Sequence, residues 1–490
     1  MRRSGILMHI SSLPSEYGIG KLGKEAYEFA DFLEKSGVSV WQILPLSPTS
    51  YGDSPYQSFS VHAGNPYFID FEKLEEQGLL FPEEYKNVNW GSDSRRVDYA
   101  LIYENVFPVL RKAYERFDTS DEDYISFCKE KSEWLPAYSL FMALKAAHGG
   151  RPWQEWEKPL AMFEEEAILE AREKYSEEAE FYSVMQYWFY SQWNDLRKYC
   201  NEKGISIVGD IPIYVAYDSA EVWQYPELFC LDEEKLPTDV AGCPPDFFSP
   251  TGQLWGNPLY DWEYHKKTGY SWWIKRLESA MKLYDTVRID HFRGFESYYA
   301  IPYGNETAEI GEWRKGPNTD LFEKAEKALG NMSIIAEDLG LITDEVREML
   351  KNCGYPGMKV LQFAFDSGSS CGDLPHNFAN SNCIVYTGTH DNMTLTGWTE
   401  SLGARSMTFA KKYLRVKDRK DIPEAMVRLA WSSTAELAVA QMQDFLGEDP
   451  NARMNTPATP SGNWQYRVQK GAFTAKLAKR ILALNEIYYR

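Results

Sequence analysis

The sequence has no excess of basic residues. It contains 52 Lys and Arg against 72 Asp and Glu, so its formal net charge is -20. Proteins that bind nucleic acids or anionic membrane surfaces need clustered Lys and Arg. The composition therefore argues against both of these partners, and it suits a neutral substrate, which needs no steering by charge.

Signals for secretion, membrane insertion and disulfide formation are also missing. No apolar run is long enough to span a bilayer, and the residues from Met1 to Ile6 lead directly into a predicted strand without a signal peptide. The cysteines are odd in number, scattered and without CxxC spacing, which indicates reduced thiols and not a disulfide framework or zinc site. We therefore expect a cytoplasmic protein. The cysteines are Cys128, Cys200, Cys230, Cys243, Cys353, Cys371 and Cys383.

Short apolar runs recur along the chain, and amphipathic helical patterns lie between them. Strands that alternate with helices predict an α/β protein with a (β/α)8 TIM barrel, a fold that accommodates roughly 200 to over 400 residues in one domain. The active site of such a barrel lies at the C-terminal ends of the strands. The predicted strands are Gly5–Ile10, Val40–Leu44, Ser206–Ile211, Thr286–Asp290, Ser333–Glu337, Met358–Phe363, Cys383–Tyr386 and Leu437–Gln441.

The spacing of these runs is uneven, which predicts large insertions into a single catalytic domain that spans 1–490. A mostly helical insertion at 67–175 follows the second strand, because one crossover helix needs far fewer residues. An aromatic, loop-like insertion at 212–268 follows the third strand, and a loop insertion at 291–317 follows the fourth. There is no clear C-terminal β-sandwich after the eighth strand, and no internal repeat or heptad pattern.

Charged residues cluster at the predicted strand ends. In the fourth strand, Val287 and Ile289 point to one face, whereas Arg288 and Asp290 share the other. By themselves, Arg288 and Asp290 fit a structural ion pair as well as they fit a functional site. However, acids also stand at or just beyond the ends of three other strands, and two histidines accompany them. These further residues are Asp210, Glu337, Asp391, His291 and His390.

Such a cluster has three possible uses. A metal site is disfavoured because runs of Asp, Asn and Glu at calcium-loop spacing are absent. Structural charge pairing is the second use. Glycoside chemistry is the third, because it needs a carboxylate nucleophile, a second carboxylic acid and sugar-stacking aromatics. Aromatic residues in the loops fit the third use, although they are also compatible with packing of the insertions. They are Tyr51, Tyr56, Trp255, Trp398 and Trp464.

The ordered set of motifs resembles the amylomaltase, or disproportionating enzyme, family of 4-alpha-glucanotransferases over nearly the whole chain. Any one motif is weak, but the series is highly specific. The motifs are Leu7–Pro14, Trp41–Leu46, Tyr51–Ser58, Gly209–Pro212, Trp255–Pro258, Thr286–Gly294, Ala336–Gly340 and Gly388–Asn392.

The resemblance implies three catalytic acids. Asp290 is the expected nucleophile, Glu337 the general acid and then base, and Asp391 a stabiliser of the transition state. Substrate contacts are expected from a further set, in which His291 is as compatible with loop packing as with sugar contact. That set is Arg288, Asp210, His390, Tyr51, Tyr56, Trp255 and His291.

The expected reaction is retaining transfer of α-1,4-glucan segments to glucose or maltooligosaccharides, without a metal or organic cofactor. The nearest alternative is an α-amylase-type hydrolase on the same barrel, which the missing β-sandwich disfavours. A non-catalytic glucan-binding protein is a third alternative, and the presence of all three acids argues against it. The sequence leaves the oligomeric state open.

Overall fold

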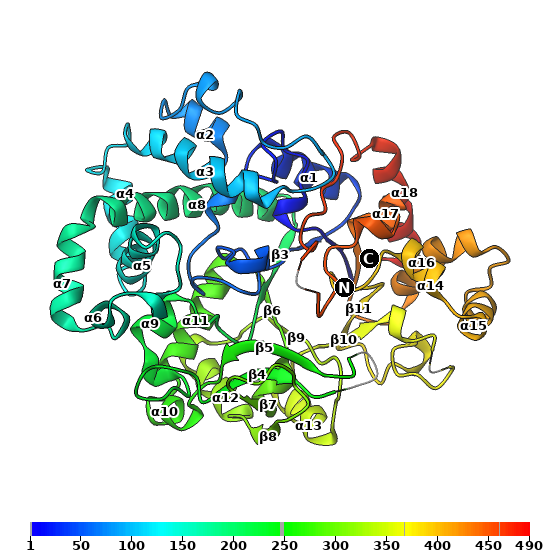
Figure 1. The fold of residues 1–490 in the computed structure, drawn as a ribbon. Helices are drawn as coiled ribbons and strands as arrows, with labels where there is room; N and C mark the ends of the chain where they lie inside the picture. The colour runs from blue at the N-terminus through cyan, green and yellow to red at the C-terminus, as the bar shows by residue number, and fades with distance from the viewer. Residues whose placement is uncertain (1, 246–248, 367, 460) are drawn as a thin grey trace.

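The computed structural model describes all residues except 1, 246–248, 367 and 460, and it leaves out the side chain of Tyr51. Within this part of the chain, eight strands form one parallel sheet in the order β10-β11-β12-β1-β2-β3-β6-β9 (Figure 1). The strands are β1 (Arg3–Leu7), β2 (Val40–Gln42), β3 (Ser206–Ile211), β6 (Thr286–Ile289), β9 (Ile334–Ala336), β10 (Gly357–Val360), β11 (Cys383–Tyr386) and β12 (Leu437–Gln441).

The sheet curls until its two end strands, β9 and β10, meet. The Ala336 N–H donates to the Pro356 carbonyl at 3.0 Å across this junction. The predicted (β/α)8 barrel is therefore confirmed. Every predicted strand is present, and the boundaries of β3, β11 and β12 match the prediction. The boundaries of β1 differ most from the predicted ones, because residues Ile10–Ser12 form a 3-10 helix instead of extending the strand.

Helices surround the barrel and form most of the segment between β2 and β3. Figure 1 shows α2 to α7 gathered on one side, beside the long helix α8 that leads back to the barrel. The helices are α1 (Lys24–Lys35), α2 (Phe71–Glu76), α3 (Tyr99–Tyr114), α4 (Glu122–Glu130), α5 (Leu135–Ala147), α6 (Lys158–Ala161), α7 (Glu165–Lys174), α8 (Ser176–Glu202), α9 (Ala220–Gln224), α10 (Trp262–Lys267), α11 (Ser271–Leu283), α12 (Thr319–Leu329), α13 (Asp344–Cys353), α14 (Leu395–Ser401), α15 (Ala404–Leu414), α16 (Ile422–Ser432), α17 (Met442–Leu446) and α18 (Ala475–Tyr488). None of the described helices is long and apolar enough to cross a membrane.

The segments 212–268 and 291–317, which were predicted to be loops, contain strands. β4 (Asp239–Cys243) and β5 (Gln253–Pro258) come from the first segment, and β7 (Ser297–Pro302) and β8 (Glu312–Lys315) from the second. They pair into one antiparallel sheet in the order β5-β4-β7-β8. Gly and Pro within β4 and β5 are typical of turns, so these strands depend on tertiary pairing and not on local preference.

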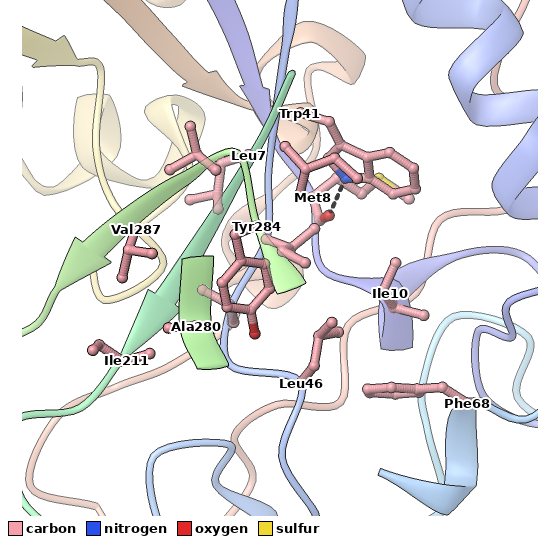
Figure 2. Packing of buried hydrophobic residues seen from close by; sticks show 14 of the residues in the cluster. Leu7, Met8, Ile10, Trp41, Leu46, Phe68, Ile211, Ala280, Tyr284 and Val287 are labelled. Atoms are coloured by element: carbon pink, nitrogen blue, oxygen red, sulfur yellow. Dashed lines mark hydrogen bonds between the residues drawn. The ribbon is translucent and has the colours of Figure 1, made fainter. Parts of the chain in front are cut away.

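The packing around β3 places Asp210 at the strand end. Figure 2 shows the ring of Tyr284 among side chains from neighbouring barrel strands, including Ile211 and Val287. Gly209 allows this arrangement, because a Cβ at this position would lie 2.1 Å from the Tyr284 ring. Any larger residue at 209 would displace the ring, so the glycine before Asp210 is a packing requirement.

Candidate active site

Arg288 on β6 connects two of the acids. Its Nη1 lies 2.6 Å from Oδ2 of Asp210, and its Nη2 lies 3.1 Å from Oδ1 of Asp290. The Arg288 and Asp210 side chains are buried, whereas the Asp290 side chain remains 30% exposed. Asp290 is therefore the member of this trio that a substrate can reach. A buried charge is tolerated only when it is paired, and Arg288 has two carboxylate partners.

Tyr56 also contacts Asp210, at the same oxygen that Arg288 contacts. Its hydroxyl donates to Asp210 Oδ2 at 2.8 Å, and its ring stacks on the His390 imidazole at a centroid distance of 5.1 Å. Trp464 lies beside both rings, at 5.7 Å from Tyr56 and 5.8 Å from His390. Burial lowers the pKa of His390, so the neutral imidazole can both donate and accept a hydrogen bond.

Glu337, directly after β9, is held by backbone donors. The His291 N–H donates to Glu337 Oε2 at 2.7 Å, and the Leu339 N–H donates to Oε1 at 3.0 Å. His291 has a left-handed backbone with φ of 50°. Such a conformation is uncommon for residues other than glycine, and it occurs often at functional sites. The residue after Asp290 therefore connects Asp290 to Glu337 through its backbone.

The Asp290 and Glu337 carboxyl groups influence each other's ionisation. Partial burial raises the pKa of Asp290 well above its usual value, and the charges of Glu337, Asp210 and Asp391 raise it further, whereas Arg288 lowers it. Burial also raises the pKa of Glu337, and this effect outweighs Arg288 and the two backbone donors. Two interacting carboxyl groups lose their protons in separate steps, so one of the two keeps its proton to a higher pH than an isolated carboxyl group does.

Asp391 lies in the loop after β11 and is oriented by residues that follow β12. The Asn455 side-chain amide donates to Asp391 Oδ1 at 2.6 Å, and Arg453 Nη2 donates to the Asp391 carbonyl at 2.5 Å. His390 Nε2 lies 3.4 Å from the same Oδ1. Neither Asn455 nor Arg453 was among the predicted site residues. A loop of polar residues after the last barrel strand was their only sequence signal.

The loop that carries Asp391 is anchored at both ends by one partly buried acid. Asp444 on α17 accepts the Thr387 hydroxyl at 2.9 Å and the Leu395 N–H at 2.8 Å. Burial raises the pKa of Asp444 to about 7. Sequence reasoning missed this residue because an acid is usually solvent-exposed and nothing in the residue type marks a structural role.

The predicted aromatic residues have different surroundings. Trp255 on β5 packs edge-to-face against the His291 ring at a centroid distance of 4.8 Å, and burial lowers the His291 pKa to about 3. Trp398 is buried against Phe365, which is a packing role. The side chain of Tyr51 lies outside the described part of the structure.

The four acids thus lie close enough for each of the other three to affect the Asp290 carboxyl, with Arg288 between two of them. Among the described residues, no group of three or more His, Cys, Asp or Glu side chains could hold a metal ion. The carboxyl groups gather at the C-terminal strand ends, where the active sites of such barrels lie, and a pair of carboxyl groups is what the cleavage of a glycosidic bond needs.

Comparisons with known proteins identify the protein family. A family model described as 4-alpha-glucanotransferase matches residues 8–474. The chain is 48% identical to the 4-alpha-glucanotransferase of Clostridium butyricum over 486 residues, covering 99% of this chain and 100% of that protein. It is 47% identical to the Thermus thermophilus 4-alpha-glucanotransferase over 496 residues, covering 99% of this chain and 98% of that protein.

A solved structure gives the same result. The amylomaltase from Streptococcus agalactiae in complex with acarbose matches with a TM-score of 0.97 and 44% identity, and the match covers 100% of both chains. This chain belongs to the 4-alpha-glucanotransferase family, as the motif series indicated.

Proposed function

We propose that the protein is a retaining 4-alpha-glucanotransferase that moves segments of α-1,4-glucan to the 4-OH of glucose or a maltooligosaccharide. The main support is the convergence of Asp290, Glu337 and Asp391 beside Arg288, within a chain of this family. Arg288 contacts Asp290 directly, which favours negative charge on Asp290, as a nucleophile requires. In the proposed mechanism Glu337 carries the proton that the leaving oxygen needs.

The proposed reaction has two displacements. A carboxylate oxygen of Asp290 attacks C1 of the donor glucose, and the C1–O4 bond breaks as Glu337 transfers its proton to O4. In the second step the acceptor 4-OH attacks C1, its proton passes to Glu337, and the bond to Asp290 breaks. Each step inverts C1, so the product retains the α configuration.

The remaining residues have proposed roles in binding the sugar. Asp391 stabilises the oxocarbenium-like transition state, and Asp210 and His390 bind sugar hydroxyls together with Tyr56. Asp210 Oδ1 is buried and has no hydrogen-bond partner among the described residues, so it can accept a hydroxyl or a water. Tyr51, Trp255 and His291 are proposed to contact further glucose units or to exclude water.

We also propose the wider setting of the enzyme. It is a cytoplasmic enzyme that needs no metal or organic cofactor, and its partners are α-1,4-glucans, maltooligosaccharides and glucose, not nucleic acid or membranes. Residues 1–490 form one catalytic domain with insertions at 67–175, 212–268 and 291–317.

A time course with maltotriose tests this function. The expected products are glucose and chains longer than maltotriose, with a constant number of reducing ends, because transfer makes one glycosidic bond for each bond it breaks. An α-amylase-type hydrolase would instead increase the number of reducing ends throughout the reaction. Chromatography of the products together with a reducing-end assay separates these two outcomes.

Replacing Trp255 by Ala is expected to increase the ratio of hydrolysis to transfer. Trp255 packs on His291, the residue after Asp290, so its loss opens the site to water. Loss of one aromatic contact, worth about 0.5–1.5 kcal/mol, corresponds to an increase of about twofold to tenfold in the ratio of hydrolysis to transfer. Trp313→Ala is the control, since Trp313 is 42% exposed on β8 of the same sheet and packs against Arg293 instead. An unchanged product profile for Trp255→Ala would count against contact between Trp255 and substrate.

A further inference from the structure

The junction between β9 and β10 has an unusual connection. Regular strand pairing links the neighbouring barrel strands from β10 through β12 and β1 to β9, but within the described residues none links β9 to β10. The Asp338 side chain bridges this gap, because its Oδ1 accepts the Met358 N–H of β10 at 2.6 Å. A carboxylate thus takes the place of the strand carbonyl that would otherwise accept this N–H.

The bridge lies next to Glu337. Ala336, the residue before Glu337, donates to Pro356 at 3.0 Å, and Asp338, the residue after it, accepts from Met358. The other neighbour of Glu337 is β6, where the Glu337 N–H donates to the Ile289 carbonyl at 3.1 Å. One flank of Glu337 is therefore tied to Met358 of β10 and the other to Pro356, the residue just before β10, while the Glu337 backbone is tied to β6.

Gly357 allows the Asp338 carboxylate to approach β10. A Cβ at Gly357 would lie 2.5 Å from Asp338 Oδ2 and 2.7 Å from Oδ1. The backbone of Gly357 does not have a positive φ, so an alanine at this position would meet the carboxylate first and would not strain the backbone. The bridge therefore depends on both Gly357 and Asp338, and a substitution at either residue can remove it.

We propose that Asp338 is a positioning residue for the general acid: by bridging β9 to β10 it fixes the backbone of Glu337, and thereby the position of the Glu337 carboxyl group relative to the glycosidic oxygen. This inference rests on the proposed function, in which Glu337 donates the proton to the leaving group. Among the described residues, Asp338 bonds to Met358 and has no hydrogen bond or ion pair with Asp290.

The test compares two donors that differ in their need for proton transfer. Maltotriose needs Glu337 to protonate the leaving oxygen. α-Maltosyl fluoride with azide as acceptor does not, because the C1–F bond breaks with departure of fluoride as Asp290 attacks, and the azide anion then displaces Asp290 without a base. A variant that disturbs only the general acid is therefore slow with maltotriose and close to wild type with the fluoride and azide.

Asp338→Ala and Gly357→Ala are each expected to lower kcat for maltotriose by about 100-fold, the effect of a displacement of about 1 Å. With the fluoride and azide both should stay within about threefold of wild type, since no proton transfer is needed. The double variant should be no slower than either single variant, because both remove the same bridge. Asp338→Asn keeps an acceptor oxygen for Met358 and should restore most of the activity.

Asp373→Ala is the matched control. Asp373 Oδ1 accepts the N–H of Val360, also on β10, at 3.3 Å, but it adjoins no catalytic residue. Equal loss with both donors, equal loss in Asp338→Ala and Asp373→Ala, or no loss at all would overturn the positioning role. Failure of the wild-type protein to convert maltotriose would instead overturn the proposed function.

Discussion

Replacement of Asp290 by Asn is expected to abolish glucan transfer while glucan binding survives. The amide has almost the same shape as the carboxylate, but it is a much weaker nucleophile, so the covalent bond to C1 does not form. The expected fall in kcat is at least about 10⁴-fold, in line with the removal of nucleophiles from other enzymes. Binding should persist because Arg288 keeps its 2.6 Å pair with Asp210. Initial rates with maltotriose and calorimetric titration with a maltooligosaccharide measure the two properties.

Asp239→Asn provides the control for this experiment. Asp239 also pairs with an arginine, since its Oδ2 lies 2.9 Å from Arg314 Nη1, but this pair belongs to the antiparallel sheet. Transfer should be unchanged in this variant. If Asp290→Asn retained wild-type turnover, Asp290 could not be the nucleophile, and a non-catalytic glucan-binding protein would become the better description.

Replacement of Glu337 by Gln is expected to slow maltotriose conversion by about 10²- to 10⁴-fold, the usual contribution of a general acid and base. In the wild type, activity should decline as pH rises through the raised pKa of Glu337, because the acid loses its proton. The Gln variant has no such proton, so this decline should disappear from its pH–rate profile. The profile of kcat against pH, measured for both proteins, gives the comparison.

Chemical rescue provides a second measurement on Glu337→Gln. With α-maltosyl fluoride and azide the variant should recover to near the wild-type rate, because neither step then requires proton transfer. A variant that stays slow under these conditions has lost more than proton transfer, and the role of general acid would have to be assigned to another residue.

The barrel could be predicted because each strand is a short apolar run that ends in polar residues. β3, β11 and β12 were predicted to the residue, since their apolar runs stop where the pairing stops. The antiparallel sheet could not be predicted in the same way. β4 and β5 contain turn-forming residues, and β4 pairs with β7 from a segment more than fifty residues further along the chain. Only the folded chain brings them together.

The acids at the strand ends could also be located from the sequence. Once the strands are predicted, their C-terminal ends are expected to meet at one face of the barrel. The residues that orient the acids could not be located in this way. Asn455 and Asp444 are distant in sequence from the loop they hold, and Asp338 appeared only as part of a motif. The imidazole ring of His291 was predicted to contact substrate, but the contact between His291 and Glu337 is made by the backbone N–H of His291. Every residue except proline has such an N–H, so the residue type could not predict this contact.

The antiparallel sheet has a consequence for engineering the enzyme. β5 carries Trp255, and β7 begins just beyond the Asp290–His291 turn, so the pairing of β4 with both β5 and β7 couples the strand of Trp255 to the loop that follows Asp290. Exchanging either segment alone between homologues would leave mismatched strand partners. Chimaeras that retune product length should therefore swap 212–268 and 291–317 together, as a single cassette.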